Sequence, residues 1–99
     1  TLHQVRGYVA FIGADGLSMD FGPSASDAAS AHLHRLVIEN AREAVLLVDS
    51  SKFGGASLFQ IVDWLRISKV VTDREPDEQW MRFFEEQNIE VIYPQESDN

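Results

Sequence analysis

The sequence contains no cysteine, so disulfides, thiolate metal sites and cysteine nucleophiles are all excluded. Basic residues are also scarce: 8 Lys and Arg stand against 16 Asp and Glu and leave a formal net charge of −8. A surface of that charge repels nucleic-acid phosphates and anionic lipid headgroups. The apolar runs are far shorter than the ~18 residues of a membrane span. We therefore expect a cytoplasmic chain that by itself binds neither nucleic acid nor a membrane.

The residues that are present fit a single domain. A length of 99 residues and an apolar content of 44% suffice for one hydrophobic core. Four short apolar runs rich in β-branched residues predict strands that are buried on both faces of a parallel sheet. These runs span residues 8–12, 44–48, 67–71 and 89–93. Because the chain begins at Thr1 and not at Met, we expect it to be a piece of a longer protein.

A helical pattern follows the first strand. Ser26 or Asp27 is a suitable N-cap, and the pattern continues to about Arg42. The apolar positions that keep a helical period, and are expected to face inward, are Ala29, Leu33, Leu36, Val37 and Ala41.

A second helical pattern begins after Pro76 and ends at Asn88. Its expected inner face consists of Trp80, Phe83, Phe84 and Gln87. Between residues 53 and 64 the pattern permits a short strand or an irregular crossover. The order β-α-β-(short element)-β-α-β predicts an α/β fold with a layered, mostly parallel sheet and flanking helices.

Polar or glycine-rich segments follow three of the predicted strands. They span residues 13–16, 49–52 and 72–73. Because the carboxyl ends of parallel strands meet at one edge, where ligands bind in such sheets, we expect these segments to converge on one site.

The most suggestive of them is Asp49-Ser50-Ser51-Lys52-Phe53-Gly54-Gly55. Serine hydroxyls and exposed backbone N–H groups can hold a phosphate, and lysine adds a positive charge. Glycine lets the backbone approach a ligand closely. The order of residues differs from a Walker A loop. The alternative interpretation is a polar turn in which Asp49 pairs with Lys52.

Residues 13–24 are predicted to form a loop that is too long and too rich in glycine to be a simple connector, and such loops are often functional. The side chains that could bind sugar hydroxyls are Asp15, Ser18, Asp20 and Ser24. The alternative is a surface loop packed by Leu17 and Phe21. Asp73 follows the third strand. We expect it to cap the turn before Pro76, and the alternative is that it contacts a ligand.

The positions of the histidines do not predict a metal site. His32 and His34 are two residues apart on a predicted helix and point to different faces, whereas helical metal ligands favour a spacing of three or four. We expect both, and His3, to be ordinary surface or boundary residues. The sequence indicates no metal and no cofactor.

Three runs in a fixed order resemble a known family. They are Phe-Ile-Gly-Ala-Asp-Gly-Leu-Ser at residues 11–18, Val-Asp-Ser-Ser-Lys-Phe-Gly at 48–54 and Val-Val-Thr-Asp at 70–73. In order and approximate spacing they are similar to the C-terminal, effector-sensing domain of DeoR-type bacterial transcriptional regulators, from about Tyr8 to Pro94. The second and third runs are the more specific ones.

The resemblance implies a fold related to ribose-phosphate isomerases and CoA transferases. It implies that the domain binds a phosphorylated sugar or sugar-derived metabolite, which changes operator affinity, and that the protein is a dimer or tetramer. It further implies that residues 1–99 are the second half of the sensing domain. A DNA-binding winged helix-turn-helix and a glycine-containing phosphate loop would then precede Thr1. The implied effector contacts are Asp15, Gly16, Ser18, Asp49, Ser51, Lys52 and Asp73.

Two positions depart from the family pattern. Ser30 stands where the family often has a glutamate, and His34 stands where a basic residue is common. Both departures predict an altered choice of ligand or weaker binding.

Two other functions remain open. One is an enzyme similar to sugar-phosphate isomerases, in which Asp15, Asp49 and Lys52 serve as base and electrophile. The related isomerases place an acidic residue where Ile12 stands and follow it with a Lys-Gly-rich loop. Because both features are missing here, we predict no enzymatic activity. The other is an oligomerisation module that uses the aromatic helix 76–88.

Overall fold

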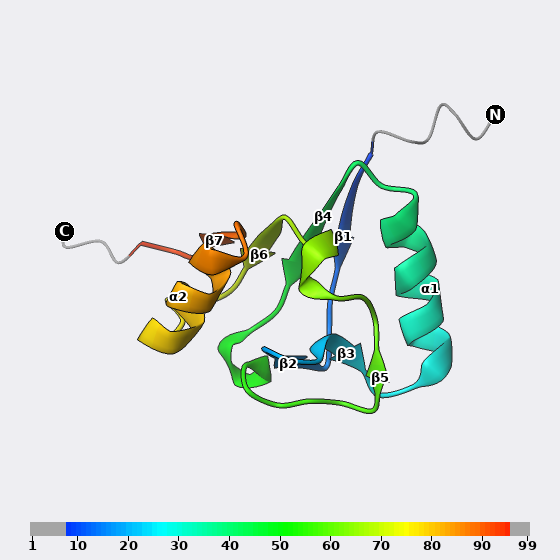
Figure 1. Cartoon of the computed structure of the whole chain (residues 1–99), viewed down its shortest axis with the longest axis horizontal. Helices are drawn as coiled ribbons and strands as arrows, with labels where there is room; N and C mark the ends of the chain where they lie inside the picture. Colours follow the sequence, from blue (N-terminus) through cyan, green and yellow to red (C-terminus); the bar gives the residue numbers. More distant parts are fainter. Residues whose placement is uncertain (1–7, 96–99) are drawn as a thin grey trace.

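A four-stranded parallel sheet forms the centre of the molecule. The computed structural model describes residues 8–95, and the strands of this sheet lie in the order β1-β4-β6-β7. They are β1 (Val9–Ile12), β4 (Glu43–Leu47), β6 (Lys69–Val71) and β7 (Glu90–Ile92). Each coincides with one of the four apolar runs, although β4 begins one residue earlier than its run, so the predicted α/β fold with a mostly parallel sheet is confirmed (Figure 1).

A second, antiparallel sheet lies beyond the end of β1, at the bottom of Figure 1. Its strands β2 (Gly16–Ser18), β3 (Gly22–Ala25) and β5 (Phe59–Gln60) lie in the order β2-β3-β5. The predicted loop over residues 13–24 was therefore wrong. Its short strands contain Gly and Pro, which are weak strand formers, and long-range contacts stabilise them. The short strand permitted between residues 53 and 64 is β5.

Helix α1 (Ala28–Glu39) begins where the sequence predicted and ends earlier. The Asp27 carboxylate accepts a hydrogen bond from the Ser30 backbone N–H at 2.7 Å, which caps the first turn. The helix packs against β1, β3 and β5.

The predicted inner face of α1 was largely wrong. Leu33 and Leu36 are 59% and 43% exposed, whereas Ala31 and Ile38 are buried. Because α1 carries apolar residues on more than one side, its period alone does not select the side that packs.

Helix α2 (Glu78–Glu86) packs against β7. Its predicted inner residues Trp80 and Phe84 are buried, and the Trp80 ring meets the ring of Phe53 edge-on at 5.2 Å. The aromatic face of α2 is therefore core and is not available as a subunit interface. Within the described part of the chain, no helix is both long and apolar enough to cross a membrane.

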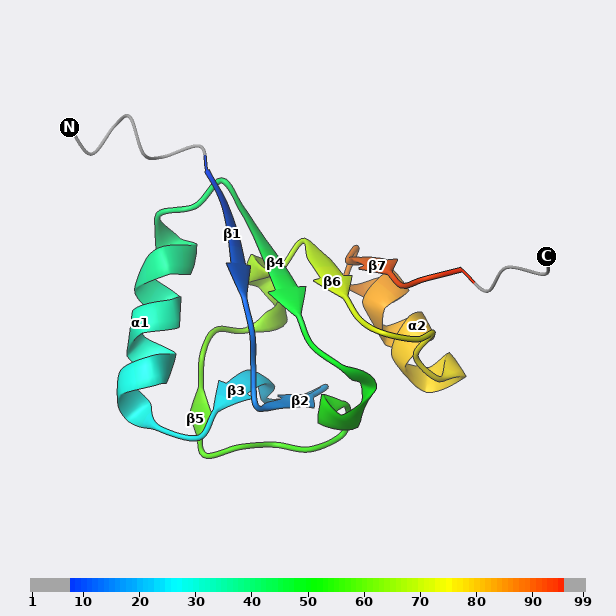
Figure 2. The same cartoon turned by 180° about the vertical axis from the view of Figure 1, so that it is seen from behind.

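One face of the parallel sheet carries exposed apolar side chains. The register and the alternation along the strands place Phe11, Leu47 and Ile92 on this face, where they are 62%, 45% and 40% exposed. Figure 2 looks onto it, and within residues 8–95 neither helix passes in front of β1, β4 or β6. The apolar runs predicted a sheet buried on both faces, whereas the described residues cover only one.

Candidate functional site

A pocket of about 370 Å³ lies beyond the carboxyl ends of β1 and β4. Three of the predicted contact residues line it: Asp15, Asp49 and Lys52. The remaining lining residues are Gly13, Ala14, Ala25, Ser30, His34, Leu47 and Val48. The two segments that follow neighbouring parallel strands therefore do converge on one pocket.

Asp15 joins the loop after β1 to the start of α1. Its Oδ2 accepts a hydrogen bond from the Ser26 backbone N–H at 2.8 Å. Hydrogen bonding from Ser26 lowers the pKa of Asp15 below its ordinary value, with smaller contributions from the charges of Lys52 and His34. The Asp15 carboxylate is therefore ionised at neutral pH.

Asp49 caps the 3₁₀ helix Ser50–Lys52 that follows β4. Its Oδ1 accepts hydrogen bonds from the hydroxyl and from the backbone N–H of Ser51, the latter at 2.9 Å. The hydroxyl bond is the main cause that lowers the pKa of Asp49. The Ser51 hydroxyl is thus directed to Asp49, and Ser51 does not line the pocket.

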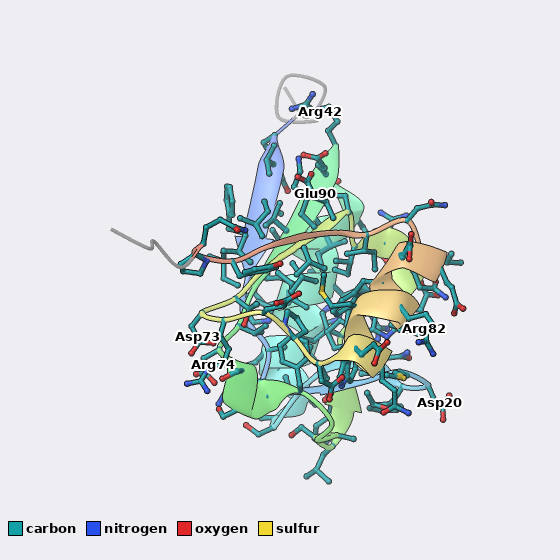
Figure 3. The ribbon with its side chains drawn as sticks, turned by 90° about the vertical axis from the view of Figure 1, so that its left-hand side faces the viewer. Asp20, Arg42, Asp73, Arg74, Arg82 and Glu90 are labelled. Carbon is teal, nitrogen blue, oxygen red and sulfur yellow. The ribbon has the colours of Figure 1, made fainter. Side chains whose placement is uncertain are left out.

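Asp73 supports the same turn from the end of β6. Its Oδ1 accepts a hydrogen bond from the Ser50 backbone N–H at 2.7 Å, and this bond is the main cause that lowers the pKa of Asp73. In Figure 3, Asp73 lies beside the green turn that follows β4. Asp73 therefore caps this turn, not the one before Pro76, and it lies outside the pocket lining.

Gly16 and Ser18 also lie outside the pocket lining, in β2. A Cβ at Gly16 would lie 2.4 Å from the carbonyl oxygen of Gly55, so this close backbone approach admits only glycine. The Ser18 hydroxyl accepts a hydrogen bond from the Phe21 N–H, and the Ser18 carbonyl accepts one from Trp64 Nε1. Both residues hold the hairpin together.

Lys52 brings a positive charge to the pocket. Within residues 8–95 the ion pairs are Lys69–Glu43, Arg74–Asp73 and Arg82–Glu78. An ion pair between Asp49 and Lys52, the alternative interpretation of this turn, is not among them. The half-buried Lys52 can therefore direct its ammonium to a bound anion.

The family resemblance connected Ser30 and His34 with ligand choice, whereas the residue pattern alone placed His34 at an ordinary surface or boundary position. Both line the pocket, and His34 Nδ1 is buried without a hydrogen-bond partner in the described structure. Ser30 and His34 are four residues apart and therefore lie on one face of α1. This spacing is the sequence signal that could have indicated that both line the same pocket. His32 is exposed, and no group of three His, Asp or Glu among residues 8–95 is arranged to hold a metal ion.

A larger hollow of about 540 Å³ lies between α2 and β7. It contains none of the predicted contact residues, and its Arg82 pairs with Glu78 in the same wall. Because it lacks convergent polar groups from several elements, the smaller pocket beyond β1 and β4 is the better candidate site.

Comparison with known proteins agrees with this geometry. Residues 1–74 match the model of the DeoR C-terminal sensor domain. The chain belongs to the DeoR family. The match includes both segments that form the pocket beyond β1 and β4 and extends to Asp73.

Curated relatives of this DeoR-family chain are named as transcriptional regulators. A proposed aga operon transcriptional repressor of Escherichia coli O157:H7 is 30% identical over 83% of the chain and 30% of its own length. The HTH-type transcriptional regulator IolR of Bacillus subtilis is 29% identical, over 83% of the chain and 33% of its own length. The deoxyribose operon repressor of Escherichia coli K12 is 27% identical over 94% of the chain and 37% of its own length. The chain thus spans about a third of the length of these relatives.

Proposed function

We propose that this chain is the effector-binding part of a bacterial transcriptional regulator of sugar metabolism. Its ligand is a phosphorylated sugar or a related metabolite, held in the pocket beyond β1 and β4. The observation that carries this proposal is the convergence of Lys52 with Asp15 and Asp49 in a DeoR-family sensor domain. The ammonium attracts phosphate, and carboxylates accept hydrogen bonds from sugar hydroxyls.

The full-length gene product provides the test. Its affinity for the DNA upstream of its own gene is measured by fluorescence anisotropy, with and without a panel of aldose and ketose phosphates. We expect at least one panel member to change the affinity, and the corresponding unphosphorylated sugar to have little effect. If the whole panel leaves DNA binding unchanged, the proposal is wrong.

We propose further that residues 1–99 are the second half of the sensing domain and that a DNA-binding domain precedes them. The exposed apolar face of the sheet supports this, because all-parallel sheets are normally covered on both faces. Strand β1 lies at the edge of the sheet, with β4 as its neighbour among residues 8–95. The greater length of the relatives is consistent with both points.

The intact mass of the native gene product tests this division. A mass of roughly 25–30 kDa leaves room for the rest of the sensing domain and for a second domain of about 50–200 residues. A mass near 11.1 kDa contradicts the proposal, because self-association or a partner must then cover the sheet.

We propose that the regulator is a homo-oligomer, a dimer or tetramer. The exposed Leu33 and Leu36 on α1 support this, since neighbouring exposed apolar side chains often mark an interface. Light scattering after size exclusion of wild type and of Leu33→Lys tests it. A monomeric wild type rejects the proposal.

We propose no enzymatic turnover. Hydrogen bonds lower the pKa values of Asp15 and Asp49, and a carboxylate with a lowered pKa is a poor general base at neutral pH. An isomerase assay with ribose 5-phosphate tests this. Turnover that disappears in Asp15→Asn would establish the enzyme alternative instead.

A further inference from the structure

A hollow of about 380 Å³ lies at the amino ends of β4 and β6, whereas the pocket beyond β1 and β4 lies at the carboxyl edge of the sheet. In Figure 3, Arg42 marks the amino edge at the top, and Asp73 lies lower, at the carboxyl edge. Two arginines line the hollow. Arg42 directly precedes β4, and Arg66 is the last residue of the second 3₁₀ helix. We call it the arginine hollow.

The charges that line the arginine hollow are mainly positive. Among its lining residues, Glu43 is the acidic one. The Glu43 carboxylate already has a partner, because its Oε2 lies 3.5 Å from Nζ of Lys69. The guanidinium groups of Arg42 and Arg66 therefore leave a local excess of positive charge. This excess belongs to a chain whose net charge is −8, so the hollow is a place where an acidic protein attracts an anion.

Arg66 keeps N–H donors available for a ligand. Its guanidinium carries five N–H groups. Within residues 8–95 its side chain donates one hydrogen bond, from Nη2 to the Ile38 carbonyl oxygen at 3.4 Å, and forms no ion pair. That long bond supports the last turn of α1 and uses one of the five donors. The other donors can bind an oxyanion through two parallel hydrogen bonds.

We propose that the arginine hollow binds a phosphate group through Arg42 and Arg66. Arginine suits phosphate because its planar guanidinium matches two phosphate oxygens at once. The phosphate belongs either to a free metabolite or to the backbone of DNA bound by the longer regulator. DNA is a plausible source because the chain enters β1 at this edge, where the Arg42 N–H donates to the Tyr8 carbonyl oxygen at 2.8 Å. Only the DNA source rests on the proposed function.

Calorimetry with pyrophosphate on the full-length gene product tests the site. All titrations use a Lys52→Ala background, so that the pocket beyond β1 and β4 does not contribute. Arg66→Gln should weaken pyrophosphate binding about tenfold, the loss expected for one hydrogen bond to a charged group. Arg66→Lys keeps the charge and should weaken binding less. Arg82→Gln is the matched control, because Arg82 is an exposed arginine that pairs with Glu78 outside the hollow.

DNA binding by the same arginine variants, with Lys52 intact, distinguishes the two sources. Fluorescence anisotropy measures the affinity for DNA between roughly 50 and 200 mM salt. If the phosphate belongs to DNA, Arg66→Gln weakens binding to every sequence alike and reduces the slope of log affinity against log salt by about 1. If it belongs to a free metabolite, the slope keeps its wild-type value while pyrophosphate binding still falls. Both results support the arginine hollow as a phosphate site.

The proposal is overturned if Arg66→Gln behaves like Arg82→Gln in both assays. Nitrogen NMR of the Lys52→Ala protein covers the case in which an Arg66 variant does not fold. We expect the Arg66 Nε resonance to shift when pyrophosphate is added, and a resonance that does not move at saturation also overturns the proposal. A phosphosugar panel without effect would reject the proposed function and leave the pyrophosphate result unchanged, so the two failures are distinguishable.

Discussion

Asp73 accepts a hydrogen bond from the backbone N–H of Ser50 at 2.7 Å, and this bond joins the end of β6 to the turn after β4. The same turn carries Asp49 and Lys52, which line the pocket. Asp73 therefore positions the pocket wall without being part of it. The motif indicated Asp73 as a ligand contact, whereas its hydrogen bond to Ser50 instead holds the turn that carries Asp49 and Lys52.

Removal of this bond should loosen the pocket. In Asp73→Ala we expect a roughly three- to tenfold loss of phosphosugar affinity, because the Ser50–Lys52 turn loses its anchor and misplacement of binding groups weakens binding. Calorimetry on the full-length gene product measures the affinity. Asp63→Ala is the matched control, since Asp63 caps the turn at Leu65 outside the pocket lining. Equal losses in both variants would contradict the positioning role.

Asp73 and two other carboxylates make the stability of the fold depend on pH. The pKa values of Asp15, Asp49 and Asp73 are lowered from an ordinary value of 3.8. Their contribution is complete above that unfolded-state value and is lost as the pH falls through the lower folded-state values. We expect the urea midpoint of wild type to decrease below about pH 4 and that of Asp73→Asn to decrease less. Parallel decreases in the two proteins would show that Asp73 does not contribute.

Gly16 should be a stability residue and not a ligand residue. Because a Cβ there meets the carbonyl oxygen of Gly55 at 2.4 Å, Gly16→Ala should destabilise the fold by about 1–3 kcal/mol, as overpacking does. Gly55→Ala is the matched control, since a Cβ at that position meets no atom within 4 Å. Urea denaturation compares the two variants. Equal stability of both would mean that the close approach of β2 to the segment at Gly55 does not constrain the fold.

Phe84 anchors the aromatic core between α2 and the segment at Trp64. Its side chain is 0% exposed, and its ring lies 5.5 Å from that of Trp64. Phe84→Ala should lower the free energy of unfolding by about 3–5 kcal/mol. Leu65→Ala removes an apolar side chain that is 84% exposed and should change stability by less than about 0.5 kcal/mol. Thermal denaturation of both variants checks this, and similar melting temperatures would contradict the assignment of α2 to the core.

The central sheet could be predicted because its signals are local. Apolar runs such as residues 44–48 predict strands wherever they occur, and the polar residues that follow them mark the ligand edge. Asp77 and Asn88 bracket α2 as expected, with Asn88 in the left-handed region at φ 60°.

The hairpin β2–β3 could not be predicted in the same way. Its stability depends on contacts between residues distant in sequence, such as the Ser24 hydroxyl, which accepts a hydrogen bond from the Ser57 N–H at 2.8 Å. That hydroxyl also donates to the Gly16 carbonyl. A serine that seemed available for sugar hydroxyls is therefore fully used inside the fold.

The candidate site was partly predictable for a related reason. Motif residues Asp15, Asp49 and Lys52 reach the pocket because they directly follow β1 and β4. His34 and Ser30 reach it from α1, and only the packing of that helix decides which of its faces turns to the sheets. The apolar side chains of Leu33 and Leu36 predicted that a different face of α1 packs inward, but both side chains are exposed.

The most direct test of the effector pocket is calorimetric titration of the full-length gene product with the phosphosugar panel, repeated on Lys52→Ala and Lys69→Ala. Lys69 is a matched control because it is a partly buried lysine that pairs with Glu43 outside the pocket lining. The account predicts tight binding by wild type and Lys69→Ala, and loss of binding by Lys52→Ala with a change in stability of only about 0–1 kcal/mol. Equal binding by all three proteins would contradict it.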